Sequence, residues 1–330
     1  MTNILGTCEV FISMGLVYSL IAMGYYITYT ILDFPDLTVE GTFLTGAVAY
    51  GLLITAGVNA WLALIAAFAA GAIFGTLTGV LYVKLKIRPL LCGILVSTAL
   101  ISVNLVATSA GVSGDFAGKS ASNINNLSRI ETSLHNIFPA DLLPARVGTV
   151  KLRDLILFLF VALVFKFLLD FFLTTKTGLL LRAAGNNPTF VTTLARDQGN
   201  MKILGLAIGN GYAAVSGALF TLISGSVNQS MGIGMVVIGL ASLIIGLSVF
   251  AKVHFLKPTT KVIIGSIIYQ LCLTVAQKLG VPDAYNKLIM AFIFTIALIL
   301  SSKMKNRSKL EKSERNSVPA EAGSSGGNGK

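Results

Sequence analysis

The sequence predicts an all-α polytopic membrane protein with about 8–10 transmembrane or half-spanning helices. Of its 330 residues, 54% are hydrophobic and only 12% are charged, whereas an ordinary soluble domain has roughly 25% charged residues. The mean hydropathy is +0.80, and the 33 glycines are spread through the apolar stretches. Glycines in such stretches let helices approach one another closely in lipid. A water-soluble fold of this length could not bury so much apolar surface.

Nine apolar segments are candidate spans, since crossing the hydrocarbon takes about 20 mainly apolar residues. They are residues 5–32, 41–57, 61–83, 89–110, 155–173, 203–224, 233–250, 262–279 and 285–300. The second and the last are short, which is typical of half-helices or re-entrant elements. The first is too long for the core of a signal peptide and has no basic region before it, so we expect it to stay as a helix.

The net charge of +11 is concentrated at the ends of these segments and in the tail. No arginine-rich stripe is interleaved with aromatic residues, which argues against a nucleic-acid partner. Lys and Arg resist translocation, and the nine crossings place every basic cluster on one side, so we expect an external N-terminus and a cytoplasmic C-terminus. The clusters are Lys84, Lys86 and Arg88; Lys176, Arg182, Arg196 and Lys202; Lys252, Lys257 and Lys261; and the basic residues from Lys303 onward.

The composition divides the chain into a transmembrane domain, residues 1–302, and a tail, residues 303–330. The tail is charged and ends in Gly, Ser and Asn, a composition that cannot bury enough apolar surface to fold, so we expect a disordered cytoplasmic tail. The polar stretch 111–151 is then the largest external loop.

Three carboxylates and no basic residue lie between the first two spans, at Asp33, Asp36 and Glu40. Acidic residues at membrane depth usually face a cavity or a partner. A second interpretation is a solvated turn in which Asp33 or Asp36 caps the next helix. Asn210 lies inside a span, where an amide forms interhelical hydrogen bonds or lines a pathway.

Glycines recur in residues 231–246, at positions 232, 234, 239 and 246. This spacing permits tight helix packing or a broken helix. Together with the acidic connection, it yields one set of candidates for a translocation pathway. They are Asp33, Asp36, Thr38, Glu40, Asn210, Gly232 and Gly234.

A short helix is predicted in the connection at residues 182–199. Asn187 suits an N-cap, Pro188 the first helical position and Gly199 a C-terminal stop. Such a helix either covers the ends of the spans or docks in the groove of a partner. The candidates for docking are Arg182, Gly185, Asn186, Asn187, Pro188, Arg196 and Gly199.

The sequence contains no recognisable catalytic motif. Residues 114–120 are similar to a phosphate-binding loop but have one residue too few between the glycines. The only histidines are His135 and His254, and no metal-ligand cluster is evident, so we expect no catalytic or metal-binding residue and no bound cofactor. Lys166 and Asp170 stand four apart and can meet on one helix face, as a pair at the membrane surface or as a buried ion site.

The stretches 32–41, 178–199 and 231–246, in this order and separation, resemble permeases of the ABC importer class that includes branched-chain amino acid and ribose systems. The likeness is greatest to permeases paired with binding lipoproteins for tryptophan, tyrosine and related solutes. It runs from about residue 5 to residue 300 and implies the ABC importer permease fold in the plasma membrane. It also implies partners: a second permease copy, most simply in a homodimer, a cytoplasmic ATPase subunit that uses ATP, and an extracellular or lipoprotein solute-binding protein.

By the same resemblance, residues 182–199 contain the helix that couples to the ATPase, and residues 33–41 and 231–246 lie near the pathway. Two acidic residues expected around the glycine-rich stretch are replaced by Asn228 and Leu247. We therefore expect a permease for a small solute, with an aromatic or other apolar amino acid favoured over a sugar or nucleoside. Two further alternatives are an ion-coupled secondary transporter, whose ion binds at the acidic connection, and a structural subunit without a pathway.

Overall fold

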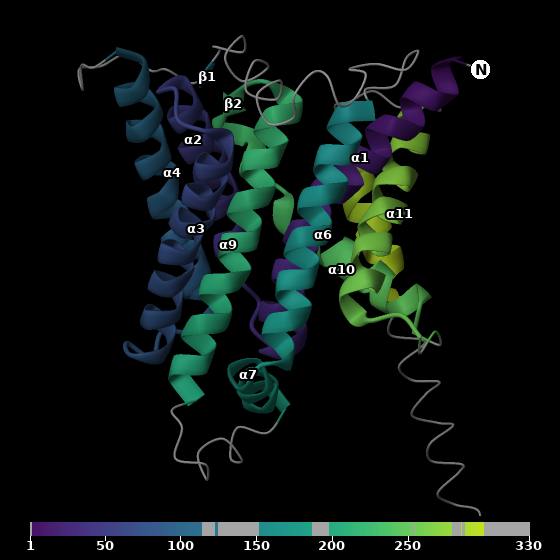
Figure 1. Ribbon diagram of the computed structural model, residues 1–330. Coiled ribbons are helices and arrows are strands. Elements are labelled where there is room, and N and C mark those ends of the chain that lie inside the picture. Colours follow the sequence, from purple (N-terminus) through teal and green to yellow (C-terminus); the bar gives the residue numbers. More distant parts are fainter. Residues whose placement is uncertain are drawn as a thin grey trace, which may run out of the picture.

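The computed structural model describes residues 2–113, 123–124, 152–186, 198–251, 253, 255–278, 285 and 288–299. Eight helices in these ranges are long and apolar enough to cross a membrane. They lie side by side in one bundle (Figure 1), which confirms the all-α membrane fold. The ninth candidate span contains a shorter apolar helix, Leu288–Ile299, while the predicted tail and most of the predicted external loop lie outside the described residues.

The helices follow the predicted spans with modest shifts at their ends. In chain order they are α1 (Thr2–Tyr25), the π-helix η1 (Tyr26–Ile31), α2 (Thr38–Thr55), α3 (Ala60–Val83), α4 (Pro89–Ser113), α6 (Leu152–Thr174), α7 (Lys176–Asn186), α9 (Gln198–Ser224), the 3-10 helix η2 (Gln229–Gly232), α10 (Met235–Val249) and α11 (Pro258–Lys278). Two short strands, β1 (Asn123–Ile124) and β2 (Val227–Asn228), pair in antiparallel fashion.

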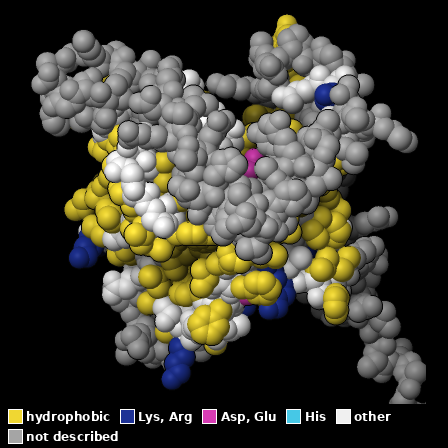
Figure 2. Space-filling view, turned by 45° about the horizontal axis from the view of Figure 1, so that its top comes forward, with side chains coloured by type: hydrophobic (Ala, Val, Ile, Leu, Met, Phe, Trp, Pro, Cys, Tyr) yellow, Lys and Arg dark blue, Asp and Glu magenta, His cyan; other side chains and the backbone are white. Residues whose placement is uncertain are grey.

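Helices α1, α2 and α9 form the interior of the bundle, with 78%, 72% and 72% of their spans buried, against 28% for α4 and α6. Large hydrophobic side chains such as Phe167 and Phe171 are exposed on α6. Among the side chains coloured in Figure 2, hydrophobic ones predominate and form a broad band. This surface suits contact with lipid.

Glycines allow the interior helices to pack with their backbones almost in contact. A Cβ atom at Gly46 of α2 would collide with the carbonyl oxygen of Ala214 on α9, and one at Gly217 of α9 would collide with that of Phe43 on α2. On α3, Gly75 likewise faces the backbone of α9. The predicted use of glycine for close helix approach is therefore confirmed at the centre of the bundle.

The first span continues through η1 and ends where the chain reverses. Asp33 is exposed and has a φ of 52°, a left-handed conformation that Asn and Asp adopt more readily than most residues. The next helix begins only at Thr38. The interpretation of Asp33 as the cap of this helix is therefore wrong.

Most of the described basic residues belong to segments at the lower end of the bundle in Figure 1, where α3 ends, α7 lies and α10 gives way to α11. Arg153 and Lys278 lie at the opposite ends of α6 and α11. At the lower end the predicted pair forms: Lys166 Nζ lies 3.4 Å from Asp170 Oδ2. Lys257 Nζ is also 3.4 Å from that oxygen, and Thr259 Oγ1 donates to Asp170 Oδ1 at 2.6 Å. Through Lys257 and Thr259, Asp170 therefore fastens α6 to the beginning of α11.

Candidate functional site

The connection between the first two spans is fixed inside the protein by Asp36, which is 1% exposed. Its Oδ1 accepts a hydrogen bond from the Thr38 backbone N–H at 2.8 Å, and its Oδ2 accepts one from Asn210 Nδ2 at 2.7 Å. The Tyr25 hydroxyl donates to the Asp36 carbonyl oxygen at 2.8 Å. Asp36 thus satisfies an N–H group at the start of α2, and it ties that start to the middle of α9.

Three further buried side chains complete this network. Thr42 Oγ1 donates to Asn210 Oδ1 at 2.8 Å, and Asn210 Nδ2 also donates to the Leu206 carbonyl oxygen at 3.0 Å. The hydroxyls of Thr38 and Thr78 lie 2.9 Å apart and join α2 to α3. The Asn210 amide therefore forms its hydrogen bonds to groups within the protein. The structure brings Asp36, Thr38 and Asn210 together in one network that connects α2 to α9 and α3.

Glu40 makes a different contact, with α10. Its Oε1 accepts a hydrogen bond from the Gly234 N–H at 2.9 Å. Gly234 is the N-cap of α10 and has a φ of 94°, which glycine adopts without steric cost. Gly232 packs against the Glu40 carbonyl oxygen so closely that a Cβ atom there would collide with it. The first turn of α2 and the N-terminus of α10 therefore meet at two points.

The chain between α9 and α10, residues 225–234, is called here the re-entrant segment. Its Gln229 Nε2 donates to the carbonyl oxygen of Ile101, near the middle of α4, at 3.0 Å. Asn228 and Ser230 are exposed, and Asn228 Oδ1 accepts from the Ser230 N–H at 3.1 Å. Irregular backbone at this depth is tolerated only where it faces protein or water, not lipid.

The glycine pattern therefore reflects both of its predicted uses. Residues 232 and 234 lie where the helix is broken, whereas Gly239 packs against the Tyr25 ring and Gly246 against the Lys261 backbone. Asn104 of α4 is 2% exposed, and its Nδ2 donates to Thr45 Oγ1 at 3.1 Å. This is an interhelical hydrogen bond between α4 and α2.

Helix α7 lies at the lower end of the bundle in Figure 1 and is fastened there by Gly185, where a Cβ atom would collide with the Ile31 carbonyl oxygen. Arg182 is exposed on α7, and Asn186 is its last residue. Gly199 lies in the first turn of α9, so the prediction that it terminates a helix is wrong. Asn187, Pro188 and Arg196 lie outside the described residues, so their predicted roles remain predictions.

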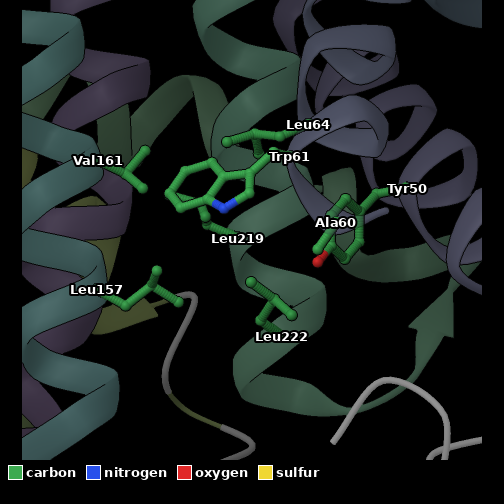
Figure 3. Close-up of a pocket in the computed structure, with 8 residues that line it drawn as sticks. All are labelled: Tyr50, Ala60, Trp61, Leu64, Leu157, Val161, Leu219 and Leu222. Carbon is green, nitrogen blue, oxygen red and sulfur yellow. The ribbon is translucent and has the colours of Figure 1, made fainter. Parts of the chain in front are cut away.

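A pocket opens between α2, α3, α6 and α9, and none of the residues of the site described above lines it. Figure 3 shows the ring of Trp61 among aliphatic side chains, with Tyr50 beside Ala60. The lining residues are Tyr50, Ala60, Trp61, Leu64, Leu157, Val161, Leu219 and Leu222. It has no charged group to bind an ammonium or carboxylate group, so the pathway candidates lie elsewhere.

Comparison with known proteins gives a consistent result. The family model described as "Branched-chain amino acid transport system / permease component" matches residues 8–298. A tyrosine transport system permease protein of Clostridioides difficile (strain R20291) is 37% identical over 297 residues, which cover 88% of this chain and 92% of the relative. An uncharacterized protein of Rickettsia prowazekii (strain Madrid E) is 30% identical over 280 residues, 84% of this chain and 91% of that protein. No solved structure shows significant similarity.

Proposed function

The chain belongs to the permease components of branched-chain amino acid transport systems, and from this premise we propose that it forms the translocation pathway of an ABC importer for an aromatic amino acid. The observation that carries the proposal is the likeness to a tyrosine permease, at 37% identity over 88% of the chain. It supports an amino acid over the sugar or nucleoside that the sequence also allowed. The chain is a multi-pass membrane protein with eight apolar helices in its described part.

The re-entrant segment is the part of the described surface best suited to the pathway. It exposes Asn228 and Ser230, and at its end Gly234 contacts the half-buried Glu40. Lipid cannot satisfy such groups, whereas a water-filled passage can. We propose that two copies of the chain face each other across this surface, so that each contributes one re-entrant segment to a shared pathway.

The energy for transport is proposed to come from separate cytoplasmic ATPase subunits, while an extracellular or lipoprotein binding protein delivers the solute. The described basic residues at one end of the bundle support a cytoplasmic location for that end, because Lys and Arg resist translocation. Helix α1 begins at the opposite end. We therefore propose an external N-terminus, a cytoplasmic C-terminus and a cytoplasmic α7.

Charge reversal on α7 tests the docking proposal. Arg182 is exposed, so Arg182→Glu leaves the packing of Gly185 intact and presents a repulsive charge to an acidic groove. We expect at least about tenfold weaker association with the ATPase, corresponding to about 1.4 kcal/mol, and unchanged membrane insertion. Co-purification of the ATPase with the tagged permease measures this.

The matched control is Lys278→Glu, at the end of α11 that lies away from α7. It reverses an exposed charge and should leave ATPase association unchanged. Equal co-purification by the Arg182 variant and the control would argue that α7 only covers the ends of the spans.

Uptake by cells tests the solute. Cells that carry the whole transport system should accumulate labelled tyrosine, and deletion of this chain should abolish that uptake. An excess of unlabelled phenylalanine or tryptophan should compete, whereas an excess of ribose should not. Competition by ribose alone would contradict the proposed solute class.

A further inference from the structure

We propose that Glu40 acts as a positioning residue, which holds the N-terminus of α10 against α2 and thereby sets the position of the re-entrant segment. The inference rests on the proposed function, because it assumes that this segment lines the pathway. It differs from the role that the acidic connection would have in an ion-coupled carrier, where a carboxylate binds the transported ion directly.

The contact has the geometry of a helix cap supplied from a neighbouring helix. Glu40 Oε1 lies 2.9 Å from the Gly234 nitrogen, at the first position before α10. A helix N-terminus has unpaired N–H groups and a partial positive charge, so a carboxylate there forms a charge-assisted hydrogen bond. The close packing of Gly232 on the Glu40 carbonyl oxygen adds a second point of contact between the re-entrant segment and α2.

The two carboxylates at the start of α2 have different surroundings, and this gives them different tasks. Asp36 is 1% exposed and joined to Asn210 in the interior. Opening that joint would leave a buried carboxylate without its hydrogen bond from Asn210, which is costly for a charged group. Glu40 is half-buried, so water can solvate its carboxylate when the bond to Gly234 breaks. The hydrogen bond between Glu40 and Gly234, called here the Glu40 joint, can therefore break while the bond between Asp36 and Asn210 stays intact.

Opening the Glu40 joint moves a defined set of groups. Gly234 adopts a left-handed conformation between η2 and α10, and glycine tolerates a wide range of conformations at such a position. Release of its N–H frees α10 to shift relative to α2, and the exposed Asn228 and Ser230 shift with it. Glu40 thus controls where the polar groups of the re-entrant segment stand.

Thiol accessibility tests this role without any ATPase. The native cysteines, Cys8, Cys92 and Cys272, are replaced by serine, Ser230→Cys is introduced, and the rate of reaction with a charged, membrane-impermeant thiol reagent is measured in membranes. Glu40→Ala should change this rate about tenfold, as expected for the loss of one charge-assisted hydrogen bond. Glu40→Gln, whose amide oxygen can accept the same bond, should leave the rate close to that of the parent.

Two further variants serve as controls. Glu9→Ala removes a half-buried carboxylate from the distant end of α1 and should leave the rate unchanged. Gly234→Ala strains the same joint from the other side, since alanine disfavours a φ of 94°, and should reproduce the change seen with Glu40→Ala. This variant keeps the test valid if Glu40→Ala fails to insert.

The proposal is overturned if Glu40→Ala and Gly234→Ala both leave the reaction rate unchanged. It is also overturned if Glu40→Gln abolishes uptake of labelled tyrosine while its reaction rate equals that of the parent, because the charge itself would then be required. If Glu40→Ala and Glu40→Gln both changed the reaction rate, the negative charge of Glu40 would be what holds the N-terminus of α10, and the positioning role would still be supported. The thiol reaction is measured on the permease alone and does not depend on the ATPase. Uptake of tyrosine that proved independent of ATP would therefore refute the proposed function and leave the positioning role of Glu40 untouched.

Discussion

Replacement of Asn210 by leucine is expected to destabilise the permease strongly. Asn210 is fully buried and donates to the carboxylate of Asp36, which is 1% exposed. Leucine cannot donate, so the carboxylate would remain buried beside an apolar side chain. Removing the hydrogen-bond donor of a buried carboxylate costs about 1–3 kcal/mol or more, out of a total stability of about 5–15 kcal/mol for a typical protein. Heating the purified protein and measuring the fraction that stays monodisperse gives the result.

An exchange of the two side chains provides the control. Asp36→Asn combined with Asn210→Asp keeps one carboxylate and one amide at the joint, and the exchanged amide can donate to the exchanged carboxylate. The double variant should therefore recover much of the stability that Asn210→Leu loses. Stability of Asn210→Leu equal to that of the parent would show that the network does not hold α2 to α9.

Replacement of Gly46 by valine should have an equally severe effect, for a steric reason. A Cβ atom at this position would collide with the carbonyl oxygen of Ala214, and the α9 backbone cannot yield as a side chain can. Interiors are packed too closely to absorb such a branched side chain, so α2 and α9 would have to separate. We expect loss of membrane-inserted, monodisperse protein, measured by size-exclusion chromatography of the solubilised chain.

Ala69→Val is the matched comparison, because Ala69 lies exposed on α3, where a larger apolar side chain meets lipid. This variant should elute as the parent does. If Gly46→Val also gave the parent profile at the parent yield, the close approach of α2 and α9 would be refuted.

The spans could be predicted from the sequence because hydropathy is a local property. Each predicted apolar segment from residue 5 to residue 279 corresponds to a helix. Helix ends were less predictable. Asp33 looked like a cap, but N-capping depends on where the next helix begins, and α2 begins only at Thr38. Gly199 looked like a stop, yet α9 begins one residue before it.

The polar joint could be predicted only in part. Asp36, Thr38 and Asn210 stood out as polar residues in or beside spans, but nothing in the sequence pairs residues 174 positions apart. Thr42 and Thr78 resemble the many threonines that bond to their own helix. In the sequence Tyr25 cannot be distinguished from a core aromatic residue, whereas in the structure its hydroxyl donates to the Asp36 carbonyl oxygen. Asn228 and Ser230 are exposed because the helix is broken between α9 and α10. The glycines of residues 231–246 predicted a break but not the residue at which it occurs.

Asp36 also separates the proposed importer from an ion-driven carrier. In an importer powered by a separate ATPase, its task is to hold α2 and α9 together, and the Asp36→Asn side chain can still accept the Thr38 N–H. In a carrier that moves ions through the acidic connection, a titratable carboxylate would be needed. The same replacement is therefore mild under one mechanism and severe under the other.

The energy source is the most direct test of the account. The permease is reconstituted in proteoliposomes with its ATPase, and the uptake of labelled tyrosine delivered by the binding protein is measured with and without ATP, and with an uncoupler. We predict that uptake requires both the ATPase and ATP, and that it survives the uncoupler. Uptake by the permease alone, driven by an ion gradient and abolished by the uncoupler, would contradict the account.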